Sequence, residues 1–294
     1  MRLKGVSNMN TQSAVTERQT MVAKPAKKNT STIWSKFKKS FLGPIIALVF
    51  FLSIWQFIPM MLDIKPFILP KPTDVIEAAT TDWALLWPAI RITIVESLIG
   101  FLLSAVIGIA ISVILASSRI LEISIYPYAV ILQTIPVIAV APIVVIWFGS
   151  GFNSIVIISF LIGFFPIISN TLMGLNSVDK NMQELFTLYN ASKWKTMWKL
   201  RIPAAMPYIM TGLKISSTLS IVGAITGEYI AGIGGGKGGL GYAITVAAVQ
   251  LKTPYLFACG IAAAVFGIGF YLIVNLFAHL MLRSWHESAM KNEK

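Results

Sequence analysis

Apolar residues dominate this chain in runs that are too long and too continuous for the core of a soluble protein. Six such stretches approach the ~20 residues that a helix needs to cross a ~30 Å hydrocarbon layer. They lie at about 41–62, 92–117, 124–148, 154–175, 204–231 and 256–282. The pattern predicts an all-α, polytopic membrane protein with six transmembrane helices.

The composition supports this interpretation and excludes other classes of protein. Of 294 residues, 56% are hydrophobic and 12% are charged, whereas soluble domains carry about 25% charged residues. The net charge of +12 does not indicate a nucleic-acid partner, because the chain has no folded polar domain to carry a basic surface. The single cysteine, Cys259, rules out an intramolecular disulfide and is expected to be buried.

The segment before the first apolar stretch is predicted to be a disordered, basic, cytoplasmic tail. Residues 1–40 contain nine Lys and Arg against one acid, Glu17. Such a composition cannot bury a core, and basic residues beside a span stay in the cytoplasm. No small-residue cleavage site follows the first stretch, so it is expected to be a true span. Residues 41–285 are then expected to form the transmembrane domain, and 286–294 a second cytoplasmic tail.

The charges of the loops predict how the chain is threaded through the membrane. The loop 63–90 has two Lys against four acids, whereas 176–203 has five basic residues. The positive-inside rule therefore places 118–123 and 176–203 in the cytoplasm, and 63–90, 149–153 and 232–255 outside. We expect a multi-pass plasma-membrane protein with both termini in the cytoplasm.

The long inner loop 176–203 is predicted to fold as two short helices joined by a sharp corner. Asn190 tolerates the left-handed conformation that such a corner requires. Ser192 can cap a second helix at 194–200, and Pro203 is expected to end that helix and redirect the chain into the membrane. The residues alone leave two functions open: an amphipathic connector lying on the membrane surface, or a projection that sets a helix into the groove of a protein partner.

The spacing of this loop resembles the EAA loop of the permease subunits of binding-protein-dependent ATP-binding-cassette importers, which reads E-A-A-x3-G-x9-I-x-L-P. The positions that carry the resemblance and the coupling role it implies are Glu184, Asn190, Ala191, Ser192, Leu200 and Pro203. Leu185 and Phe186 replace the two alanines, and Asn190 replaces the glycine. Asn is the usual substitute for Gly at a left-handed helix end, so the implied geometry is kept.

The resemblance extends over about residues 60–285. Further segments are similar, in the same order, to the branch of these permeases that handles nitrate, aliphatic sulfonates, taurine and thiamine or pyrimidine precursors; they are 68–72, 100–101, 132–136, 147–149, 164–166 and 239–241. The resemblance implies a permease pair, usually a homodimer, that encloses the translocation path. It also implies a cytoplasmic ATPase subunit that binds ATP and Mg²⁺, and an external solute-binding protein that delivers the solute. This chain itself is expected to bind no cofactor.

Polar residues inside the predicted spans are candidates for the translocation path, because buried polar groups in a membrane tend to face a water-filled cavity. The candidates are Glu96, Gln133, Ser217, Ser220 and Glu228. The alternative for the hydroxyls is ordinary helix packing, since Ser often hydrogen-bonds within or between membrane helices.

Catalysis by this chain is not expected. The Gly-rich segment 234–239 contains Lys237, but Gly follows this lysine where a phosphate-binding loop needs Ser or Thr. His279 and His286 have no carboxylate or thiol at metal-ligand spacing, so no metal site is predicted. ATP hydrolysis is expected in a separate subunit. The alternative function is a channel-like or signalling polytopic membrane protein that has no ATPase partner.

Overall fold

The computed structural model describes residues 33–231 and 238–290, and every regular element within these ranges is helical. The chain divides into two compact units, Met1–Ile54 and Trp55–Lys294. The described part of the first unit belongs to helix α2 (Ile33–Met61), whose side chains from residue 43 onward are mostly exposed. Residues 33–40 are therefore helical, although they were predicted to be part of the disordered tail. The rest of that tail, 1–32, lies outside the described residues.

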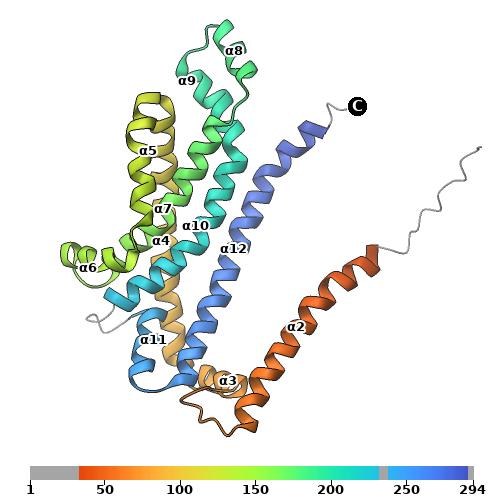
Figure 1. Ribbon diagram of the computed structural model, residues 1–294, viewed down its shortest axis with the longest axis vertical. Helices are drawn as coiled ribbons and strands as arrows, with labels where there is room; N and C mark the ends of the chain where they lie inside the picture. The colour runs from red at the N-terminus through yellow and green to blue at the C-terminus, as the bar shows by residue number, and fades with distance from the viewer. Residues whose placement is uncertain (1–32, 232–237, 291–294) are drawn as a thin grey trace, which may run out of the picture. The chain divides into compact units, whose positions relative to one another are not determined.

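The core of the second unit is formed by four long helices: α4 (Trp83–Ser117), α7 (Phe152–Asn176), α10 (Ile202–Ala231) and α12 (Thr253–Met290). Helix α7 packs most extensively against α10 and then against α4, while α10 also contacts α12 (Figure 1). Their shared apolar core includes Phe101, Ile167, Leu172, Met210 and Phe270. Five helices of the described chain are long and apolar enough to cross a membrane. The chain is thus an all-helical, multi-pass membrane protein.

Small residues allow the core helices to approach closely. The Ser104 hydroxyl on α4 donates a hydrogen bond to the Phe160 carbonyl on α7 at 2.8 Å, and Ser159 on α7 donates to the Ser220 carbonyl on α10 at 2.7 Å. A Cβ added at Gly223 would lie 2.7 Å from the Cα of Ser159. Interhelical hydrogen bonds and close backbone contact are the means by which helices associate in a membrane, where lipid is as apolar as the side chains.

The third predicted span is not one continuous helix. It is divided into α5 (Arg119–Thr134) and α6 (Val137–Phe148), with a break at Ile135 and Pro136. Proline has no N–H to donate and disfavours helical geometry at the residue before it, so a helix usually stops there. The apolar run and a kink at Pro136 agree with the sequence, but a complete division into two helices was not predicted.

Two short helices occupy segments that were predicted only as outer loops. Helix α3 (Pro72–Thr81) precedes α4, and α11 (Leu240–Val249) precedes α12. The Thr253 hydroxyl donates to the Phe67 carbonyl at 2.6 Å, which joins the two outer segments. Helix α8 lies at the opposite end of this unit from α3 and α11 (Figure 1). Two of the segments that charge assigned to the outside, those that contain α3 and α11, therefore lie at the same end of this unit.

Candidate functional site: the helical knuckle

The predicted inner loop folds into a compact projection, residues 179–201, which we call the knuckle. It consists of α8 (Lys180–Leu188), α9 (Lys193–Thr196) and a π-helical turn, η1 (Met197–Arg201). The Asp179 carboxylate starts α8 by accepting a hydrogen bond from the Asn181 N–H at 3.1 Å. An acidic side chain is a favourable N-cap, because it satisfies a free amide and interacts well with the helix dipole.

The corner between α8 and α9 is closed by the backbone. Asn190 has a φ of 50°, the left-handed conformation predicted from the sequence. The Asn190 N–H donates to the Thr187 carbonyl at 2.9 Å, and the Ala191 N–H donates to the Phe186 carbonyl at 2.9 Å. These two bonds form a Schellman motif, which satisfies carbonyls that the end of a helix leaves free.

Ser192 is the N-cap of α9, the second helix of the knuckle, as the sequence predicted. Its side-chain oxygen accepts a hydrogen bond from the Lys195 N–H at 3.3 Å. The Thr196 hydroxyl in turn donates to the Ser192 carbonyl at 3.2 Å. The capped start and the Schellman corner together hold the two short helices in one geometry.

The prediction that Pro203 ends the second helix is wrong. The chain stays helical from Lys193 to Ala231, so the knuckle runs directly into α10. The reason is the π-helical turn: the Ile202 N–H donates to the Met197 carbonyl, five residues earlier, instead of four. Shifting the hydrogen bonds by one residue just before Pro203 accommodates a residue that has no N–H to donate. Leu200 lies within this turn and is half-buried.

The outer surface of the knuckle presents large apolar and aromatic side chains. Leu188 is 79% exposed, Tyr189 80% and Trp194 67%. Glu184 is also exposed, and within the described residues no hydrogen bond or ion pair restrains its carboxylate. Glu184 therefore does not set the angle between the helices, but it is available to a partner.

Glu228, a predicted path residue, joins three helices of the span region. Its carboxylate accepts hydrogen bonds from the Thr93 hydroxyl on α4 and from the Gly241 N–H on α11, both at 2.5 Å. Thr93 accepts a further bond from the Leu240 N–H at 2.8 Å. Glu228 is completely buried and fully occupied by this network. The structure therefore places it as an anchor for the start of α11. Thr93 was missed by the sequence analysis because a single threonine in an apolar run carries no distinctive signal.

Three other predicted path residues are also buried in helix contacts. Glu96 lies near Glu228, and its Oε2 has no hydrogen-bond partner among the described residues. The Ser217 hydroxyl donates to the Lys214 carbonyl of its own helix at 2.7 Å. Ser220 lies against Gly163 of α7, where a Cβ would overlap the Ser220 hydroxyl. Ser220 thus lies in the packed interface between α7 and α10, while Ser217 is buried and bonds to its own helix, and both are ordinary ways in which serine serves in membrane helices.

Gln133 differs from the other path candidates because it lines a cavity. The cavity has a volume of about 340 Å³ and lies beside the break between α5 and α6. Its other walls are apolar and include Leu161, Phe165 and Leu219. Gln133, near the end of α5, is the polar residue in the lining of this cavity. Two further residues considered in the sequence, Lys237 and His286, lie outside the residues whose side chains are described.

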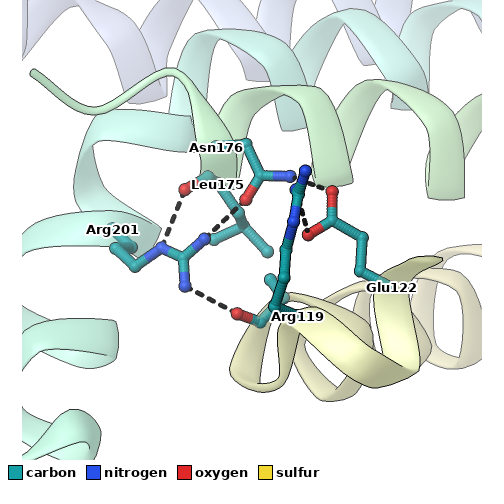
Figure 2. A network of polar contacts seen from close by, with 6 residues as sticks. Arg119, Glu122, Leu175, Asn176 and Arg201 are labelled. Atoms are coloured by element: carbon teal, nitrogen blue, oxygen red, sulfur yellow. Dashed lines mark hydrogen bonds and ion pairs between the residues drawn. The ribbon is translucent and has the colours of Figure 1, made fainter.

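Arg201, at the end of the π-helical turn, was counted in the sequence only as one of the basic residues of the loop. In the structure it donates hydrogen bonds to the Leu175 carbonyl at 2.8 Å, the Ala116 carbonyl at 2.6 Å and the Asn176 side-chain oxygen at 2.6 Å (Figure 2). Asn176 then donates to the Glu122 carboxylate at 2.8 Å. The signal that could have revealed Arg201 is its position: an arginine entering a long apolar helix must find acceptors nearby.

Comparison with known proteins agrees with this architecture. Residues 106–286 match the family described as "Binding-protein-dependent transport system inner membrane component". The matched segment includes the knuckle and the four core helices from part of α4 onward.

Several individual proteins are similar over most of the chain. The formylaminopyrimidine transport permease protein of Halalkalibacterium halodurans is 34% identical, over 80% of this chain and 93% of its own. The riboflavin transport system permease protein of Chloroflexus aurantiacus is 31% identical, over 86% and 93%. A probable ABC transporter permease protein of Haemophilus influenzae is 30% identical, over 83% and 98%. Relatives at 27–29% identity are named for aliphatic sulfonates, nitrate and taurine. With this match and the helical architecture described above, the chain belongs to the family of inner-membrane permease components of binding-protein-dependent transport systems.

Proposed function

We propose that this chain is the membrane-spanning subunit of an ATP-driven importer and that its knuckle is gripped by a separate cytoplasmic ATPase subunit. The observation that carries the proposal is the construction of the knuckle. A Schellman corner at Asn190 and a cap at Ser192 fix two short helices, while Leu188, Tyr189 and Trp194 stay exposed. A fixed helix with an apolar face suits insertion into a groove on another protein.

The continuity of the knuckle with α10 supports a mechanical role. Because the helix does not stop at Pro203, a displacement of α9 moves the start of α10 directly. Helix α10 also packs on α7, α4 and α12, which form the core. Movement produced by ATP binding and hydrolysis in the partner would therefore reach the membrane part through a rigid element. ATP and Mg²⁺ belong to that partner, and this chain performs no hydrolysis of its own.

The proposal also covers the remaining partners and the orientation. An external solute-binding protein delivers the solute, and a second permease half, an identical chain, completes the path within the lipid bilayer. The end that carries the knuckle faces the cytoplasm, together with both termini, since five basic residues lie in 176–203. The membrane is the bacterial plasma membrane.

The solute is proposed to be small. The names of the relatives support pyrimidine precursors, riboflavin, aliphatic sulfonates, nitrate and taurine as candidates. Gln133 is proposed as a residue of the path, because it borders the cavity at the break between α5 and α6. A polar side chain beside such a break is well placed to line the path, because the backbone groups that the break leaves free need polar neighbours or water.

Reconstitution tests the proposed function. The chain would be placed in liposomes with its ATPase subunit and its solute-binding protein, and uptake of each candidate solute would be measured with and without ATP. Uptake that requires ATP and both other proteins supports the proposal. Uptake by the chain alone, down a gradient and without ATP, would instead support the channel-like alternative.

A further inference from the structure

We infer that Arg201 is a positioning residue that locks the knuckle to the ends of α4 and α7, so that motion of the knuckle is delivered to these helices as well as to α10. The inference rests on the proposed function of the knuckle and names the residue through which coupling spreads. It begins from the contacts of a single guanidinium group, which donates to three acceptors on the ends of two helices, α4 and α7 (Figure 2).

The first step is the nature of the acceptors. Ala116 is in the last turn of α4, and Leu175 is in the last turn of α7. The final carbonyls of a helix have no partner within the helix and carry its negative dipole end. The Arg201 guanidinium therefore caps two helix ends at once, with bonds of 2.6 Å to Ala116 and 2.8 Å to Leu175. A flat, charged fork with several donors is suited to this task, whereas the single ammonium of a lysine is not.

The second step extends the contacts to α5. The Asn176 side chain accepts from Arg201 at 2.6 Å and donates to Glu122 at 2.8 Å, so it bridges the two. Glu122 is also 3.3 Å from Arg119 in an ion pair on α5. Its carboxylate attracts the Arg201 guanidinium electrostatically in addition. The start of α5 is thus connected to the base of the knuckle through one amide side chain.

The third step is the open space around this network. A groove of about 490 Å³ lies between the knuckle and the ends of α4 and α5. Gln183, Thr187 and Trp194 line it from the knuckle, and Val113 and Ser117 line it from α4. The groove separates these surfaces, and the knuckle joins the membrane helices at its two ends: at Val178, which lies just after α7 and is buried, and at η1, where Met197 is buried in the core and Arg201 makes the hydrogen bonds. A rigid element that is attached to its neighbours through few residues transmits its displacement through those residues.

The experiment uses the full transporter, with its ATPase subunit and solute-binding protein, in liposomes. The variants are Arg201→Gln, Arg201→Lys and Asn176→Ala. Lys199→Gln is the matched control, because Lys199 lies in the same π-helical turn, carries the same charge and is exposed. Three quantities are measured: co-purification of the ATPase, basal ATP hydrolysis, and the stimulation of hydrolysis by the binding protein carrying whichever candidate solute stimulates the wild type most.

The inference predicts that all four variants retain the ATPase and its basal hydrolysis, because none of the substituted residues belongs to the exposed face of Leu188, Tyr189 and Trp194 that the ATPase is proposed to grip. In the Arg201 variants the stimulation of hydrolysis should fall by roughly tenfold, a change of the size that typical coupling free energies produce. Asn176→Ala should show a smaller loss of stimulation. Lys199→Gln should behave like wild type. Hydrogen exchange supplies a readout that needs no solute: amides of the knuckle and of the last turn of α4 should exchange faster in the Arg201 variants. A purely local capping role would loosen the α4 end and leave stimulation unchanged.

Stimulation in Arg201→Gln equal to that of Lys199→Gln would overturn the inference. If Arg201→Gln does not insert in the membrane, the stimulation of ATP hydrolysis measured with Asn176→Ala tests the inference instead. This substitution leaves both carbonyl contacts of Arg201 in place and removes only the link to Glu122. The failure of the proposed function looks different: the wild-type chain itself would not retain an ATPase subunit.

Discussion

The Glu228 carboxylate accepts a hydrogen bond of 2.5 Å from the Gly241 N–H, and this bond fixes the start of α11 to the last turn of α10. Thr93 completes the arrangement from α4 by donating to the same carboxylate. The two donors satisfy both oxygens of a completely buried carboxyl group, and a buried polar group without hydrogen-bond partners would be costly. The relationship therefore makes Glu228 a structural joint between α10, α4 and α11.

Replacement of Glu228 tests this joint. Glu228→Leu should destabilise the detergent-solubilised protein by about 1–3 kcal/mol, the usual cost of leaving a buried donor, here the Gly241 N–H, without its acceptor. Glu228→Gln should cost less, since the amide oxygen can still accept from Gly241 and the amide nitrogen can donate to Thr93. Thermal unfolding followed by fluorescence measures both. Equal stability of Glu228→Leu and wild type would show that the network does not hold α11.

The close approach of α7 and α10 gives a second prediction. Gly223→Leu should reduce stability strongly, because its Cβ would lie 2.7 Å from the Cα of Ser159, and backbone cannot yield as a flexible side chain can. Overpacking of this kind costs typically about 1–3 kcal/mol or more. Gly269→Leu is the matched control, since a Cβ there meets no atom within 4 Å. Comparable melting temperatures for the two variants would contradict the packing of α7 on α10.

The orientation can be tested by labelling. Thr73 and Ser192 are both exposed, and they lie in segments that were assigned to opposite sides of the membrane. Each would be replaced by Cys in a Cys259→Ala background, and intact cells would be treated with a membrane-impermeant thiol reagent. We expect Thr73→Cys to react and Ser192→Cys to react only after the cells are opened. Reaction of Ser192→Cys in intact cells would reverse the orientation and remove the ATPase from reach of the knuckle.

The helix cap at Ser192 predicts a graded effect. Ser192→Ala removes the acceptor of the Lys195 N–H and should weaken α9 by about 1 kcal/mol, whereas Ser192→Asp should preserve the cap. The readout is hydrogen exchange of the α9 amides in the solubilised protein. Faster exchange in both variants would mean that the hydroxyl acts in some way other than capping.

Much of this fold could be predicted from the sequence, because membrane helices follow the simple rule that apolar runs must be long enough to cross the bilayer. The corner at Asn190 and the cap at Ser192 were also predictable, since each depends on one residue and its backbone. A kink at Pro136 was also predictable, whereas the full division of the span into two helices was not, because both halves of the run are apolar. The continuation through Pro203 could not be foreseen, because it depends on a one-residue shift of backbone hydrogen bonds.

The polar residues were harder to assign than the helices. Glu228 and Ser220 were correctly identified as unusual, but whether such groups face water or another helix depends on packing, which sequence alone does not contain. Arg201 was overlooked as a site because its acceptors, Ala116 and Leu175, are backbone carbonyls that have no sequence signature. Arg201 became a candidate site because of its position beside the ends of α4 and α7, which its residue type alone does not reveal.

The central claim is that the knuckle is a preformed shape that an ATPase subunit grips. Its most direct test is co-purification of the ATPase from detergent-solubilised membranes with wild type, Asn190→Gly and Ala191→Pro. Proline at residue 191 removes the N–H that bonds to Phe186 and disfavours the left-handed conformation of Asn190, so it opens the corner. Glycine at 190 adopts that conformation without strain. We predict that Asn190→Gly retains the ATPase like wild type, while Ala191→Pro loses most of it yet remains inserted in the membrane. Retention of the ATPase by Ala191→Pro, with transport equal to wild type, would show that the knuckle is only a connector and contradict this account.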